Sequence, residues 1–326
     1  MDWFERLTGF KVEGYDQTQS LLEVDGENLR STVNGKSYRV GRLTRPSLRE
    51  LRDQLALGPG QGQLEFDEII DDVRSLHRSG ENSGAFFQVA SQFNLLEMVG
   101  PDVCPEDGVT GYQWDRTQGP ACAISAGAAT IYRNYFAPVG HQVGQTSALQ
   151  VDCLADVRSQ LAMHLNVSPE ELWTMENGYP IATRDSLQAI SDWIMQASIE
   201  EVDTLRSRLR IGVHNDVEVT DEPEIPRSVV SQAFCSALPV SYSRVAVALW
   251  EPFGRLVLEA SYEATLSAAA LHAARAGKNT VYLTRLGGGA FGNPPDWIDA
   301  ALRRALQKFA DCPLRVFLVR YGGGRA

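Results

Sequence analysis

Hydrophobic and polar residues follow two different periods along this chain, and the two periods alternate through its second half. Short apolar or alternating runs predict strands, and longer runs with apolar residues three and four positions apart predict helices. The predicted strands are residues 85–90, 210–214, 216–220, 279–286 and 314–319, and the predicted helices of the second half are residues 256–276 and 297–309. Residues 229–237 and 244–249 are expected to bracket a polar loop. Strands that alternate with helices favour an α/β layered fold.

The first half of the chain predicts smaller elements. Residues 21–24 and 37–40 alternate in polarity and are expected to pair as a hairpin. The helices expected from apolar spacing are residues 47–57, which Ser47 would cap, residues 64–76 and 121–135, and two or three segments within 148–210, one of them starting at Ser168-Pro169. The glycine-rich stretch 58–62 and the polar stretch 80–84 are predicted breaks between elements.

A glycine-rich loop follows the strand predicted at 279–286. Its sequence is Gly287-Gly288-Gly289-Ala290-Phe291-Gly292-Asn293, and a helical pattern begins at Trp297. Backbone amides of such a loop can surround a phosphate, because glycine has no side chain to hold the ligand away. An ordinary tight turn between strand and helix is the alternative. The loop matches neither the G-x-G-x-x-G dinucleotide motif nor the Gly-Lys-Ser/Thr motif of nucleotide hydrolases.

Composition limits the possible functions. The chain has 326 residues, 44% of them hydrophobic, and a formal charge of −11, which argues against general binding of nucleic acid or of an anionic membrane surface. We find no apolar run long enough for a membrane helix and no basic, apolar secretion signal at the start. The five cysteines are scattered and lie at no metal-ligand spacing, so we expect reduced thiols, no bound metal and a cytoplasmic location. We also expect a monomer.

An acidic loop covers residues 100–120. Four carboxylates crowd it: Asp102, Glu106, Asp107 and Asp115. Crowded carboxylates beside a cleft suit acid–base catalysis or a metal, whereas the alternative is that they cap turns on the surface. The loop ends in Gln118-Gly119-Pro120 at the start of a predicted helix, whose amides could form a second anion site.

Two other polar segments have weaker signals. The alternation at residues 216–220 would place Asp216, Glu218 and Thr220 on one face of a strand. Residues 231–242 are small and polar within an apolar context, and either line a pocket or form a buried, hydrogen-bonded segment. Cys235 lies in this segment, but no histidine stands at a spacing known for cysteine nucleophiles.

Together these residues resemble a known family, the macrodomains. The strand 279–286 with the glycine loop is similar to their second phosphate loop, and residues 87–94 are similar to the strand that ends in their ribose-binding asparagine. The usual Asn-Ala-Ala-Asn is replaced by Ser-Gln-Phe-Asn. The resemblance is nearest to the branch that removes ADP-ribose from arginine on ubiquitin, and it covers roughly residues 64–135 and 205–320.

The resemblance implies a three-layer α/β/α fold with a mixed central sheet. Residues 1–60 would form an N-terminal extension, and residues 61–326 a catalytic domain with a helical insertion at about 148–208. ADP-ribose would be the ligand or product, with no cofactor. The implied ligand-binding residues are Gln92, Asn94, Gln118, Gly119, Gly287, Gly288, Gly289, Ala290, Phe291, Gly292 and Asn293.

The same resemblance implies an ADP-ribosyl hydrolase that acts on modified arginine, with an ADP-ribosylated protein such as ubiquitin as the partner. Asp107 and Asp115 would be the catalytic carboxylates and Glu106 a third candidate. Cleavage at the ribose C1 would pass through an oxocarbenium-like state, which carboxylates stabilise. A reader module that binds ADP-ribose without cleaving it, and a hydrolase of another ADP-ribose derivative, are the alternatives.

Overall fold

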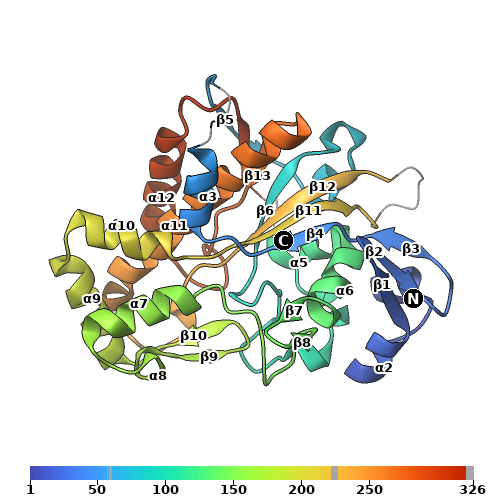
Figure 1. Cartoon of the computed structure of the whole chain (residues 1–326), viewed down its shortest axis with the longest axis horizontal. Coiled ribbons are helices and arrows are strands. Elements are labelled where there is room, and N and C mark those ends of the chain that lie inside the picture. Colours follow the sequence, from blue (N-terminus) through green and yellow to red (C-terminus); the bar gives the residue numbers. More distant parts are fainter. Residues whose placement is uncertain (57, 59–60, 222–226, 321–326) are drawn as a thin grey trace.

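The computed structural model describes residues 1–56, 58, 61–221 and 227–320. Its centre is a mixed sheet of seven strands (Figure 1), which are β4 (Arg42–Thr44), β5 (Glu65–Ile70), β6 (Phe86–Ala90), β11 (Gly212–Glu218), β12 (Val229–Cys235), β13 (Thr280–Leu283) and β14 (Arg315–Arg320). They lie in the order β4-β11-β12-β6-β13-β14-β5. β11 is antiparallel to both of its neighbours, and the pairs from β12 to β5 are parallel.

Helices cover both faces of this sheet. One layer is built around the 30-residue helix α11 (Val247–Ala276), which packs against α3 (Leu48–Leu55), α9 (Arg184–Gln196), α10 (Ile199–Ser207) and α12 (Pro295–Lys308). The other layer contains α4 (Val73–Arg78), α5 (Gln118–Ser125) and α6 (Gly127–Tyr135). The predicted α/β/α layering with a mixed central sheet is therefore confirmed.

Helix α11 also fixes the end of β13. Most of its residues are buried, as expected for a helix that is apolar on all sides. The hydroxyl of Tyr262 donates to the carbonyl of Thr284 at 2.7 Å and accepts from the amide of Leu286 at 3.0 Å. These two bonds hold the chain at the start of the glycine loop.

The N-terminal residues form a small unit beside the sheet. It contains α1 (Trp3–Thr8), α2 (Tyr15–Ser20) and a sheet of β1 (Leu22–Asp25), β2 (Asn28–Ser31) and β3 (Ser37–Arg39) in that order. The predicted pairing of residues 21–24 with 37–40 is wrong, because a turn at Gly26 pairs β1 with β2 first and places β2 between the two predicted partners.

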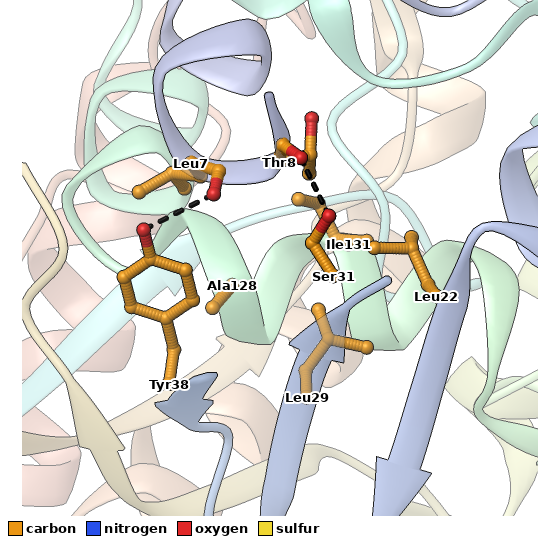
Figure 2. Close-up of a pocket in the computed structure, with 8 residues that line it drawn as sticks. All are labelled: Leu7, Thr8, Leu22, Leu29, Ser31, Tyr38, Ala128 and Ile131. Carbon is orange, nitrogen blue, oxygen red and sulfur yellow. Dashed lines mark hydrogen bonds between the residues drawn. The ribbon is translucent and has the colours of Figure 1, made fainter. Parts of the chain in front are cut away.

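Figure 2 shows how this unit is fastened to the main body. Side chains from α1, β1, β2, β3 and α6 converge, and the hydroxyl of Tyr38 donates to the carbonyl of Leu7 at 3.1 Å. Ser31 donates in the same way to the carbonyl of Thr8 at 2.5 Å. The gap between these side chains has no room for a water-sized ligand, so this is packing rather than a site. The first 60 residues also supply β4 and α3 to the main body.

Residues 64–76 do not form the predicted helix. Residues 65–70 are the edge strand β5, paired with β14, and only Val73–Arg78 is helical, with Asp72 as its N-cap. The segment Glu-Phe-Asp-Glu-Ile-Ile fits the apolar spacing of a helix and also that of a strand. Its pairing with β14, some 250 positions later, makes it a strand.

Three other predicted elements have different boundaries. The single helix expected at 121–135 is two helices, α5 and α6, separated by the non-helical backbone of Ala126. The two strands expected at 210–220 are the single strand β11, with a bulge between His214 and Val217 where Asp216 has a φ of 59°. The helix predicted from Ser47 is present, and Ser47 and Glu50 form a capping box.

The middle of the chain lies at the carboxyl end of the central strands. It contains β7 (Pro138–Val139), β8 (Gln142–Val143), α7 (Ala155–Leu165), α8 (Pro169–Leu172), β9 (Thr174–Glu176) and β10 (Tyr179–Ile181). The hairpin of β9 and β10 turns at Asn177-Gly178, and the amide of Phe93, just after β6, donates to the carbonyl of Gly178 at 3.1 Å. The insertion therefore packs on the loop in which ligand contacts were predicted.

Candidate functional site

The candidate site is the place where the central parallel strands end. β6 lies between β12 and β13, and its pairing with β12 continues to Ala90. The pairing with β13 ends at Phe87, so the two strands diverge over their last residues. Ligands of open α/β sheets bind at such carboxyl ends. The loops that meet here are residues 91–99, 236–242 and 284–293.

Gln118 fills the gap between the diverging strands. Its side-chain oxygen accepts from the amide of Ala90 at 3.0 Å, and its side-chain nitrogen donates to the carbonyl of Gln88 at 2.8 Å. A side-chain amide thus replaces the strand that β6 has lost on this side. Gln118 was predicted to bind ligand, but in this structure the oxygen and the nitrogen of its side-chain amide both form hydrogen bonds with the main chain of β6.

Gly119 brings the first turn of α5 directly onto the end of β6. A Cβ atom at this position would lie 2.0 Å from the carbonyl oxygen of Ala90 and 3.2 Å from Cγ of Glu97. No other residue type fits without moving the backbone. The predicted second anion site at this helix start is therefore tightly packed against β6.

The glycine loop is held in a fixed conformation by the loop after β12. Gly287 has a φ of 75°, and a Cβ there would lie 2.5 Å from Cβ of Ala237. The side chain of Asn293 donates to the carbonyl of Leu238 at 2.8 Å, while the amide of Ser241 donates to the carbonyl of Phe291 at 3.1 Å. Gly287 and Asn293 thus have structural reasons for their identity as well as the predicted ligand role, and the main chain at Phe291 is held in place.

Three successive amides of the glycine loop are available to a ligand. The amides of Gly288 and Gly292 bond to the carbonyls of Arg285 and Gly289. Within the described residues, the amides of Gly289, Ala290 and Phe291 have no hydrogen-bond partner. Gly289 and Ala290 are exposed and Phe291 is half-buried. Adjacent free amides on an exposed loop form the kind of nest that binds phosphate.

Three aromatic rings join the loops of the site to the insertion. Tyr179 of β10 lies 5.3 Å from Phe291 and 5.2 Å from Tyr242, measured between ring centroids, and Tyr242 lies 5.7 Å from Phe291. The hydroxyl of Tyr179 donates to the carbonyl of Met98 at 2.8 Å. One residue of the insertion thus contacts all three loops. Tyr179 was not predicted, and Tyr242 entered only as the end of the segment 231–242, because their meeting depends on segments far apart in the sequence.

Asn94 and Gln92 are covered by the hairpin of the insertion. Asn94 is 0% exposed, its side-chain nitrogen donates to Gln150 at 2.7 Å, and its side-chain oxygen accepts from the amide of Leu96 at 3.1 Å. Gln92 accepts from the amide of Met98 at 2.8 Å. Gly178 lies against both side chains, since a Cβ there would be 2.7 Å from each. As placed, neither residue offers a ligand the surface that their predicted role requires.

Two of the predicted catalytic carboxylates accept hydrogen bonds from backbone amides. Glu106 accepts from the amide and hydroxyl of Ser147 at 2.8 and 2.9 Å. Partial burial acts to raise the pKa of Glu106, but these hydrogen bonds outweigh it and lower the pKa. Asp107 is exposed and accepts from the amide of Cys104 at 2.8 Å. Asp107 thus follows the turn-capping alternative raised for the acidic loop, whereas Glu106 ties that loop to Ser147, 41 positions away.

Asp115 and Asp102 are the two acids of the loop whose charges act on Tyr179. Burial raises the pKa of Tyr179, and after the neighbouring Tyr242 the negative charges of Asp115 and Asp102 add to this rise. The ring of Tyr179 in turn contacts Phe291 of the glycine loop. Asp115 also accepts from the amide of Thr117 at 2.8 Å, which orients it at the entrance to α5. Asp115 is thus the predicted carboxylate best placed for chemistry.

Glu97 is a buried carboxylate that the sequence analysis missed. Its nearest cation is Arg133 at 3.5 Å, and neither carboxylate oxygen has a hydrogen-bond partner within the described part of the chain. Burial raises the pKa of Glu97 to about 7, against the opposing effect of Arg133. The signal in the sequence was a lone charge within the apolar run Leu-Leu-Glu-Met. It lies behind Gly119, away from solvent.

The weaker sequence candidates have structural roles. Asp216 pairs with Arg275 at 2.6 Å on the surface, and the hydroxyl of Thr220 accepts from the amide of Gly127 at 2.8 Å. Glu218 accepts from the amide of Arg39 at 2.7 Å. Cys235 is buried, and burial raises the pKa of its thiol to about 12, which disfavours the thiolate that a nucleophile needs. The predicted shared face of 216–220 is interrupted by the bulge at Asp216.

The described part of the chain holds neither a metal-binding cluster nor a membrane-spanning helix. Across the described residues, no three His, Cys, Asp or Glu side chains come together as a metal ion would require. None of the described helices, α11 included, is both long and apolar enough to cross a bilayer. A cavity of about 330 Å³ lies between α3, α11 and α12, lined by Arg52, Glu263 and Lys308 among others, and none of the three site loops lines it.

Comparison with known proteins gives matches among solved structures alone. No family model and no curated protein matches the chain. Poly(ADP-ribose) glycohydrolase from Deinococcus radiodurans in complex with ADP-ribose is 14% identical, with a TM-score of 0.46, over 87% of this chain and 88% of that one. Poly(ADP-ribose) glycohydrolase from Thermomonospora curvata is 12% identical, with a TM-score of 0.45, over 95% of this chain and 92% of that one.

These matches correct the family assignment. The structures that align with this chain are poly(ADP-ribose) glycohydrolases, one of them bound to the inhibitor ADP-HPD, and not hydrolases of ADP-ribosyl-arginine. The predicted membership of the ADP-ribosyl-arginine branch is therefore wrong. At 12 to 14% identity the likeness concerns the arrangement of the chain, and it assigns no residue of this protein a role.

Proposed function

We propose that this protein binds ADP-ribose and is a glycohydrolase that cleaves a glycosidic bond at the distal ribose. The observation that carries the proposal is the row of partner-free amides at Gly289, Ala290 and Phe291, at the carboxyl ends of the central strands. A diphosphate is the group that such a nest binds best. An aligned glycohydrolase is bound to ADP-ribose, and ADP-ribose is therefore the ligand that we propose to test.

The surroundings of the amides suit the rest of this ligand. Phe291 and Tyr242 are half-buried and offer ring faces and edges to a ribose or a base. The formal charge of −11 repels a phosphate at long range. An anionic ligand therefore has to be bound by a localised site. Fixed amides bind through short-range hydrogen bonds and are less affected by that field.

Asp115 is the proposed catalytic carboxylate. Hydrolysis at the anomeric carbon builds positive charge on the ribose ring, which a nearby carboxylate stabilises while it orients the attacking water. Asp115 is partly buried and lies close enough to Tyr179 to raise its pKa, and Tyr179 contacts Phe291 of the nest. Asp102 is the second carboxylate near this point.

A binding module without activity is the second candidate. It is favoured by the engagement of Glu106 and Asp107 in backbone caps and by the cover over Asn94. The two functions share the nest and differ in turnover. Release of ADP-ribose from a substrate separates them.

The experiment begins with the nest. Gly289 has open space around its Cβ direction and no left-handed φ, so a side chain fits there. Gly289→Asp places a negative charge beside the diphosphate and is expected to weaken ADP-ribose binding at least tenfold in calorimetry, whereas the isosteric Gly289→Asn is the matched control. Equal affinity of the Asp and Asn variants would exclude this loop as the diphosphate site.

Turnover is measured on a panel of substrates. The panel contains poly(ADP-ribose), O-acetyl-ADP-ribose and ADP-ribosylated protein, with release of ADP-ribose followed by mass. Release from one of them supports the glycohydrolase. Tight binding of ADP-ribose without release from any of them supports the binding module instead.

A further inference from the structure

The cavity between α3, α11 and α12 is separate from the proposed ADP-ribose site. Its volume of about 330 Å³ lies within the range of about 300–1,000 Å³ that pockets for small ligands occupy. None of the loops 91–99, 236–242 and 284–293 lines it. A molecule bound in this cavity would therefore be a second ligand, bound beside the helical layer rather than at the carboxyl ends of the strands.

One part of the cavity wall is apolar. Leu55 and Ala56 come from the end of α3, while Phe309 and Cys312 come from the turn after α12. Phe309 and Cys312 are buried, and Leu55 is half-buried. An apolar group gains free energy when it moves from water to such a wall. The wall thus favours a ligand with an apolar body.

The polar part of the wall contains a carboxylate that is already paired. Glu263 is 0% exposed and accepts from Arg52 at 2.6 Å, from Arg304 at 2.7 Å and from Lys308 at 2.5 Å. Burial acts to raise the pKa of Glu263, but the hydrogen bonds from these three cations outweigh it and lower the pKa to about 2. Glu263 therefore needs no cationic ligand to balance its charge.

Two hydrogen-bonding groups of the wall remain for a ligand. Ser267 lies one turn after Glu263 on α11 and is 0% exposed, and its hydroxyl has no hydrogen-bond partner among the described residues. A buried hydroxyl without a partner lowers stability, so such groups are rare. The ammonium of Lys308 has three N–H donors, and in the described part of the chain Glu263 alone accepts from it. A carboxylate can accept from an ammonium and from a hydroxyl at once.

We propose that this cavity binds a small aliphatic monocarboxylate, whose carboxylate accepts from Lys308 and Ser267 and whose chain lies against Leu55 and Phe309. The proposal is independent of ADP-ribose binding, so either proposal can fail without the other. Asp311 also lines the cavity and is exposed. Its negative charge opposes a carboxylate, and Asp311→Asn is therefore expected to tighten binding about twofold.

The test uses octanoate, with the neutral octanamide and the cationic octylammonium as its matched probes, in titrations followed by NMR of the probe. Octanoate is expected to bind about tenfold more tightly than octanamide. Lys308→Gln should weaken octanoate binding about tenfold, and Ser267→Ala about threefold. Ser267→Ala removes a hydroxyl that has no partner, so the fold should persist. Lys36→Gln, at an exposed lysine of the N-terminal unit, is the control.

Cys312 gives a second measurement, at the cavity itself. Its thiol is 6% exposed and lines the cavity, so octanoate is expected to slow its modification by methyl methanethiosulfonate, read by mass on the peptide that contains it. A modification rate that does not depend on octanoate would overturn the proposal. Octanoate affinity that is unchanged in both Lys308→Gln and Ser267→Ala would do so too, as would tighter binding of octylammonium than of octanoate. Displacement of octanoate by ADP-ribose would place the carboxylate at the glycine loop instead.

Discussion

The side chain of Gln118 bonds to the main-chain amide of Ala90 at 3.0 Å, and this bond closes the gap where β6 and β13 diverge. The same side chain donates to the carbonyl of Gln88 at 2.8 Å. Main-chain groups at a strand end must find partners or water. Here a side chain from the start of α5 supplies both, so the loop, the helix and the sheet are fixed relative to one another.

Removal of this side chain is expected to destabilise the protein. Gln118→Ala leaves the amide of Ala90 and the carbonyl of Gln88 without these partners, which should lower the free energy of unfolding by about 1–3 kcal/mol in urea titrations. Gln113→Ala is the control, because Gln113 is exposed in the same loop. An unchanged urea midpoint for Gln118→Ala would show that water replaces the amide fully.

A methyl group at Gly119 is expected to lower the free energy of unfolding more than the Gln118→Ala replacement does. The added Cβ would lie 2.0 Å from the carbonyl oxygen of Ala90, which belongs to the backbone of the central strand and has little freedom to move. We expect Gly119→Ala to lower the free energy of unfolding by about 3 kcal/mol or more. Gly111→Ala is the comparison, since Gly111 has open space around it. Similar stability of the two variants would mean that α5 can shift away from β6.

The parts of the fold that could be predicted are those specified by neighbouring residues. Ser47 caps α3 through Glu50, three positions away, and the apolar run at 85–90 is a buried central strand. The glycine loop was likewise found from its own sequence, since its glycines meet a local backbone requirement at Gly287. Local pattern and observed structure agree in these segments because the decisive contacts are close in sequence.

The parts that could not be predicted depend on distant partners. β5 was taken for a helix because its pairing with β14 is about 250 positions away. The cover over Asn94 comes from Gly178, and the support for Ala90 comes from Gln118. The carboxylates of the acidic loop looked equivalent in sequence. The structure separates them, because Glu106 meets Ser147 while Asp115 lies near Tyr179.

Glu97 is expected to make stability depend on pH. The folded protein raises the pKa of this carboxyl from 4.5 to about 7, so the folded state holds the proton more tightly than the unfolded state. The stabilisation is fully present below about pH 4.5 and is lost as the pH rises through 7. Glu97→Gln cannot lose the proton. The difference in unfolding free energy between the two proteins should therefore change by about 3 kcal/mol from pH 4.5 to 7 in favour of the variant.

The measurement is a series of urea titrations across that pH range. Glu170→Gln is the control, because Glu170 is exposed and its replacement should give a difference that does not vary with pH. A constant difference for Glu97→Gln as well would show that Arg133, at 3.5 Å, keeps the carboxylate ionised at all these pH values.

Hydrolysis is expected to depend on Asp115 more than on the other acids of its loop. Asp115→Asn keeps an oxygen that can accept from the amide of Thr117, so the turn should persist while the negative charge is lost. The rate of ADP-ribose release from the accepted substrate should fall about 100-fold or more, with little change in ADP-ribose affinity. Glu106→Gln is the matched control, since its carboxylate is occupied by Ser147. Asp107→Asn retains an acceptor for the amide of Cys104 and should lower the rate less than Asp115→Asn. A larger loss at Asp107 than at Asp115 would move the catalytic role to the tip of the acidic loop and would require that loop to close over the ribose.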